Sequence, residues 1–126
     1  GGSKWVEVEK HHRALLDRVT FTAAFVYNRR QESISINGKH FVKYAPARIL
    51  RKIVSEHVDS GRVEFEHREF THDTSIITDP SAPNLVVRLR RIAEQLRRRC
   101  PQVAITRAGR GVIGFQPSCK VTYREK

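Results

Sequence analysis

The segment NLVVRLRRIAEQLRRR, residues 84–99, restricts the possible folds of this chain more than any other stretch. Its leucines and isoleucine recur every three or four positions, which predicts a single amphipathic helix. Pro101 follows at once and is expected to end that helix. The predicted apolar face carries Leu85, Leu89, Ile92, Ala93 and Leu96. A helix with such a stripe needs a core to pack on, so the rest of the chain must supply one.

The remainder of helix 84–99 is strongly basic, with six arginines and the single acid Glu94. Val87, Arg91, Glu94 and Arg98 lie opposite the apolar stripe on a helical wheel, and Asn84, Arg88 and Gln95 flank them. The planar guanidinium of arginine fits guanine O6 and N7, or a phosphate, with two hydrogen bonds. This pattern predicts a helix that enters a DNA major groove. The alternative is a solvated surface helix whose arginine stems cover apolar neighbours.

The positive charge of the chain is concentrated in its C-terminal third. Of the net charge of +11, residues 84–126 contribute +9, from eleven Lys and Arg against two acids. Residues 1–83 hold thirteen basic and eleven acidic groups. A one-sided basic surface favours a polyanion as partner, because each neutralised phosphate releases condensed counterions.

The other segments predict a mixed set of elements. Residues 20–44 read as about three antiparallel strands with a turn at Asn37-Gly38. A helix is expected from Pro46 to Gly61, with Val58 among its core residues, and a short helix or helical turn over 64–74. Residues 77–84 read as a loop in which Asp79, Ser81 and Asn84 offer capping oxygens. Residues 103–117 predict a hairpin with its tip at 108–111, and the tail is a candidate further strand.

This order predicts an α+β fold: a winged helix-turn-helix with a small N-terminal antiparallel sheet and a C-terminal β-hairpin wing. The winged-helix domain is expected to span residues 20–126. Residues 1–3 resemble a cloning remnant, in which case an upstream signalling domain is absent from the chain. Residues 4–19 predict an amphipathic helix that serves as a linker, a homodimerisation element or a cover for the sheet.

The segment 33–117 resembles the OmpR-type winged-helix effector domain of bacterial response regulators. The resemblance lies in the strand and glycine turn ISING, the helix ILRKIV before Gly61-Arg62-Val63, and Arg68-Glu69-Phe70. It includes the apolar spacing of helix 84–99 and the run from Thr106 to Gly111. The resemblance implies sequence-specific binding of double-stranded DNA by a cytoplasmic transcription regulator. Carried over by position, Arg88 and Arg91 would face the groove, and Arg107 or Arg110 would belong to the wing.

Signals for other chemistry are weak in this sequence. His67 and His72 are five positions apart, which does not suit two metal ligands on one helix, so no metal or other cofactor is expected. The acids at 64–73 accompany no nucleophile, so the chain is not expected to be an enzyme. Cys100 and Cys119 are expected to be reduced thiols. No apolar run is long enough to span a membrane.

Two other functions remain open. A winged helix can also act as a protein-interaction module without specific DNA binding, because fold does not fix function. RNA binding would need aromatic side chains exposed on a sheet, and the alternating Phe21, Phe25 and Tyr27 fit the core side better.

Overall fold

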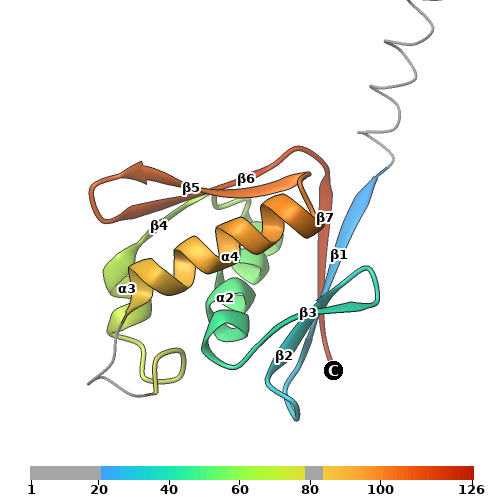
Figure 1. Cartoon of the computed structure of the whole chain (residues 1–126), viewed down its shortest axis with the longest axis horizontal. Helices are drawn as coiled ribbons and strands as arrows, with labels where there is room; N and C mark the ends of the chain where they lie inside the picture. The colour runs from blue at the N-terminus through green and yellow to red at the C-terminus, as the bar shows by residue number, and fades with distance from the viewer. Residues whose placement is uncertain (1–20, 79–83) are drawn as a thin grey trace, which may run out of the picture.

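Two β-sheets and three helices make up the computed structural model, which describes residues 21–78 and 84–126 (Figure 1). The predicted α+β class is confirmed for these residues. The predicted helix at 4–19 and the capping residues Asp79 and Ser81 lie outside them.

The first sheet contains both ends of the described chain. It comprises β1 (Thr22–Asn28), β2 (Ser33–Ile36), β3 (Lys39–Lys43) and β7 (Lys120–Glu125), in the order β3-β2-β1-β7. The pairs β1–β2 and β2–β3 are antiparallel, as predicted, and Asn37-Gly38 forms the β2–β3 turn with positive φ at both residues. The tail adds β7 beside β1, and these two strands run parallel.

The second sheet consists of β4 (Glu64–Glu66), β5 (Val103–Gly109) and β6 (Val112–Pro117), in the order β4-β6-β5. The prediction of helix from residue 64 is therefore wrong at its start, and α3 covers only His67–Thr71. Phe65 is fully buried between the exposed Glu64 and Glu66, which is the alternation of a strand. Three residues are too few for that alternation to stand out from the helical pattern beside them.

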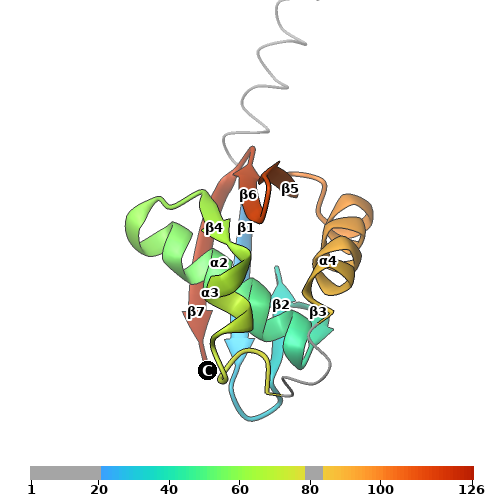
Figure 2. The same cartoon turned by 90° about the vertical axis from the view of Figure 1, so that its left-hand side faces the viewer.

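Helix α2 (Ala45–Ser60) packs against the first sheet, and α4 (Leu85–Arg99) lies across α2 (Figures 1 and 2). Pro46 lies in the first turn of α2, and Gly61 ends the helix in the left-handed conformation with φ of 75°. The core position predicted for Val58 is wrong, because its side chain is 45% exposed. Val58 lies in the last turn of α2, beyond Val54, which is the last buried residue of that helix.

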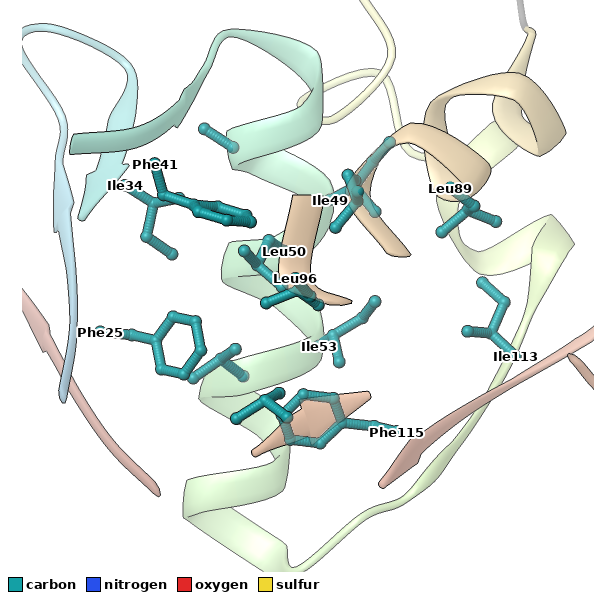
Figure 3. Packing of buried hydrophobic residues seen from close by; sticks show 14 of the residues in the cluster. Phe25, Ile34, Phe41, Ile49, Leu50, Ile53, Leu89, Leu96, Ile113 and Phe115 are labelled. Carbon is teal, nitrogen blue, oxygen red and sulfur yellow. The ribbon is translucent and has the colours of Figure 1, made fainter. Parts of the chain in front are cut away.

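One hydrophobic core joins both sheets to α2 and α4 (Figure 3). The first sheet contributes Phe25, Ile34 and Phe41, and the second sheet contributes Ile113 and Phe115. Between them lie residues of the two helices, namely Ile49, Leu50 and Ile53 of α2 with Leu89 and Leu96 of α4. Phe25 and Tyr27 are buried here, on the core side of the sheet as expected. Helix α4 is thus held by a core that both sheets share.

Candidate nucleic-acid interface

Helix α4 divides into a buried stripe and a charged outer surface. Leu85, Leu89, Ile92 and Leu96 are buried, as their spacing predicts, whereas Ala93 is only partly covered. The residues opposite this stripe form an outward ridge: Val87, Arg91, Glu94 and Arg98, all exposed. Their spacing of four, three and four places them in one line along the helix. The predicted orientation of α4 is therefore confirmed.

The C-terminal end of α4 is fixed to the first sheet by Arg99. Its guanidinium donates hydrogen bonds to the carbonyl of Phe41, at 3.1 Å, and to that of His40. It also lies over the Phe41 ring, 5.0 Å from the centroid. Arg99 therefore has a structural task, although it belongs to the same run as the exposed Arg97 and Arg98.

The hairpin β5–β6 stands beside the other flank of α4. Its turn passes through Gly111 with φ of 68°, and Arg107 and Arg110 are exposed near this tip. Gly114 of β6 is buried against β5, where an added Cβ would lie 2.9 Å from the Thr106 hydroxyl oxygen. The two strands thus approach closely, and the hairpin tip lies at the same end of the molecule as the start of α4 (Figure 1).

A groove of about 370 Å³ separates α4 from the hairpin. Its floor is mainly apolar, and the two arginines that line it come from opposite sides, Arg90 from α4 and Arg107 from β5. The apolar lining consists of Val86, Leu89, Ala93, Ile105, Val112 and Ile113. This groove brings together a predicted residue, Arg107, and one that was missed, Arg90.

The seven residues predicted to bind nucleic acid are distributed over three regions. Arg91 and Arg98 lie on the outward ridge, and Arg107 and Arg110 lie on the hairpin. The other three, Asn84, Arg88 and Gln95, lie on the flank of α4 that also carries Arg99 and therefore faces β3.

One prediction for the start of α4 needs correction. The capping role expected of Asn84 is wrong, because its side chain makes no capping hydrogen bond; its carbonyl accepts the N–H of Arg88 at 3.0 Å. Arg88 is half-buried on the flank of α4 away from the hairpin, whereas Arg90 lines the groove beside the hairpin. A helical wheel shows that Arg90 is exposed, but it does not show on which flank the hairpin packs.

The charges of this region are largely unbalanced. Arg98 pairs with Glu94 at 2.9 Å, an exposed contact between residues four apart. Arg90, Arg91, Arg97, Arg107 and Arg110 form no ion pair with another residue in the described ranges. Because solvent screens exposed pairs, the Glu94–Arg98 pair offsets little of the positive potential. The helix and hairpin therefore present one positive surface.

Acidic residues around the start of α3 make specific contacts with their neighbours. Glu66 and Glu69 form a reciprocal capping box at the start of α3, and Glu69 also pairs with Arg62. Burial alone would raise the pKa of Glu69, but hydrogen bonds from Arg62 and from the Glu66 N–H lower it below the usual value. These carboxylates hold α3 in place beside the hairpin.

Other groups in the described ranges offer little chemistry. Burial raises the pKa of the Cys100 thiol, so the arginines nearby do not make it a thiolate. Among residues 21–78 and 84–126 no three potential metal ligands come together. No helix in these ranges has both the length and the apolar character needed to cross a bilayer.

Comparison with known proteins found no matching family model, curated protein or solved structure.

Proposed function

We propose that this chain is a winged-helix domain that binds double-stranded DNA sequence-specifically and regulates transcription. In this arrangement α2, α3 and α4 are the three helices, and α4 is the recognition helix. The hairpin β5–β6 is the wing, and β4 is the short strand that joins it to the helices. The observation that carries the proposal is the exposed arginine surface of α4 and the adjacent hairpin, on a helix anchored by its opposite face.

The shape of this surface suits a major groove. A recognition helix must expose long polar side chains along one line while its other face is fixed to the domain. Arg91, Glu94 and Arg98 of the outward ridge meet the first requirement, and the four buried apolar residues of α4 meet the second. Arg91 on the ridge is the candidate for base contacts, and Arg107 and Arg110 are placed to contact the DNA backbone or the minor groove.

The charge of the surface sets an expected salt dependence. If Arg90, Arg97, Arg107 and Arg110 each neutralise one phosphate, log K falls with log salt with a slope of about −3.6. Affinity should then fall on the order of 10²-fold between about 50 and 200 mM salt. A surface that binds through apolar contacts would show a much smaller change.

The test is fluorescence anisotropy of the whole chain with a random-sequence duplex across a salt series. The double variant Arg91→Glu/Arg107→Glu should lose binding at every salt concentration, because it reverses one charge on the ridge and one on the wing. Its matched control is Arg30→Glu/Arg124→Glu, which makes the same charge change at two exposed residues of the first sheet and its β1–β2 turn. Equal losses in both variants would reduce the effect to net charge and refute this interface.

A protein-interaction module is the second candidate, and the apolar floor of the groove beside α4 favours it. A partner would then insert an apolar side chain between α4 and the hairpin. In that case the salt slope for DNA would be shallow, and Arg91→Glu/Arg107→Glu would bind DNA no worse than its control does.

A further inference from the structure

Two exposed valines stand at the beginning of α4. Val86 is 54% exposed and Val87 is 42% exposed, and neither belongs to the buried core. Single exposed apolar residues are common, but these two are adjacent and lie among arginines. Valine is also a poorer helix former than the residues that usually occupy exposed helix positions. Helix stability and core packing therefore do not explain them.

The two valines have different surroundings. Val86 lines the groove beside the hairpin, whereas Val87 is the first member of the outward ridge. It is the one apolar residue of that ridge, and Arg91 follows it one turn later. Val87 thus lies in the N-terminal part of α4, and this is the part of a recognition helix that approaches the base edges.

The mixed chemistry around Val87 decides what kind of partner fits. An apolar protein surface would have to bury the neighbouring arginines, and charged groups left unpaired on burial are costly. A polyanion that also presents an apolar group would satisfy both. Duplex DNA does so, because the C5-methyl of thymine is the apolar group that the base edges present in the major groove.

We propose that Val87 contacts the C5-methyl group of a thymine in the major groove and is a specificity-determining residue for a thymine-containing site. This inference rests on the proposed DNA-binding function. The side chain of Val87 is short, so it reads a base only where the helix lies closest to the groove floor. Arg91, one turn further on, has the length to reach a guanine edge or a phosphate beside that thymine.

The experiment compares DNA with and without the thymine methyl. The whole chain first selects its preferred duplexes from a random-sequence library, and the enriched pool is then resynthesised with deoxyuridine in place of thymidine. This exchange removes only the C5-methyl groups. The wild-type chain should bind the deoxyuridine pool about fourfold more weakly, since one apolar group loses its contact.

Variants identify which residue reads the methyl. Val87→Ala should bind the two pools about equally, because its methyl contact is already lost. Val58→Ala is the matched control, since Val58 on α2 has a similar exposure of 45% and should keep the wild-type difference. Thermal unfolding checks that both variants are folded.

The outcomes separate this inference from the proposed function. No DNA binding at low salt would refute both. Binding without enrichment of any sequence, or equal wild-type affinity for the two pools, would refute the inference and leave DNA binding in place. A difference between the pools that persists in Val87→Ala would assign the methyl contact to another residue and overturn the inference.

Discussion

At the scale of single residues, the three arginines that end α4 show that one sequence run serves different tasks. Arg98 pairs with Glu94 in solvent, Arg97 is exposed, and Arg99 reaches back to two carbonyls of β3. The position on the helix decides among these roles, because Arg99, unlike Arg97 and Arg98, lies on the flank that faces the first sheet. A basic residue at a helix C-terminus also interacts favourably with the helix dipole.

Replacing Arg99 should therefore cost stability where replacing Arg97 does not. Arg99→Ala removes two charge-assisted hydrogen bonds and the contact with the Phe41 ring, and we expect a loss of about 1–2 kcal/mol in the free energy of unfolding. Arg97→Ala is the control and should change this free energy by less than about 0.5 kcal/mol. Urea denaturation measures both, and equal effects would contradict a special role for Arg99.

At the scale of elements, the hairpin β5–β6 has to be rigid if it is to lie beside α4 at a fixed distance. Its stiffness depends on close contact between the strands around Gly114, where Thr106 and Ala108 of β5 leave no room for a side chain. Strand β4 pairs with β6, on the edge of the hairpin opposite β5, and α4 packs against β5. The hairpin is therefore held by a third strand and by a helix.

Gly114→Ala should destabilise the hairpin and the domain. The added Cβ would lie 2.9 Å from the Thr106 hydroxyl and 3.3 Å from the Ala108 Cβ, so β5 would have to move. We expect a loss of about 1–3 kcal/mol, typical of overpacking, measured by thermal unfolding. Gly109→Ala is the control, because its nearest contact would be an ordinary 3.8 Å to Val112. The proposal of a crowded strand pair fails if both variants melt alike.

At the scale of the whole molecule, the last strand, β7, pairs with the first strand, β1, so the two ends of the described chain lie side by side. The carboxylate of Glu125 in β7 accepts hydrogen bonds from Arg29 after β1, from Arg51 of α2 and from the Tyr123 hydroxyl, each at 2.7 Å. The hydrogen bond from Tyr123, followed by those from the two arginines, lowers the pKa of Glu125 below its usual value. This cluster joins the two ends of the described chain to the central helix, on the side away from the arginine surface.

This cluster predicts a pH dependence. A carboxyl whose pKa is lowered on folding stabilises the protein above its unfolded pKa, near 4.5, and this stability is lost as the pH falls through the folded pKa. Glu125→Gln should cost about 1 kcal/mol at pH 7, a modest figure because the site is partly solvated. Below about pH 4.5 the variant and the wild type should converge. A constant difference across urea titrations at several pH values would contradict this assignment.

The sequence predicted well those features that local spacing encodes. Helix α4 could be predicted because the spacing of Leu85, Leu89, Ile92 and Leu96 matches its buried face. The β2–β3 turn could be predicted because Asn37 and Gly38 both tolerate positive φ. Strand β4 was not predicted, because three residues are too few to show the alternation of buried and exposed side chains that identifies a strand. The pairing of β7 with β1, like the groove that joins Arg90 to Arg107, depends on contacts between distant segments. Nothing in the local pattern around Arg90 specifies such a neighbour.

The parallel pairing of β1 with β7 has a consequence for how the chain folds. Thr22 lies beside Lys120, so this contact closes a loop that contains nearly the whole described chain. Closing so long a loop costs conformational entropy before any hydrogen bond forms, and such non-local contacts slow folding. The hairpins β1–β2 and β5–β6 form between neighbouring segments and need no such closure. We therefore expect the helices and hairpins to assemble first, and the last strand to complete the sheet in the final step.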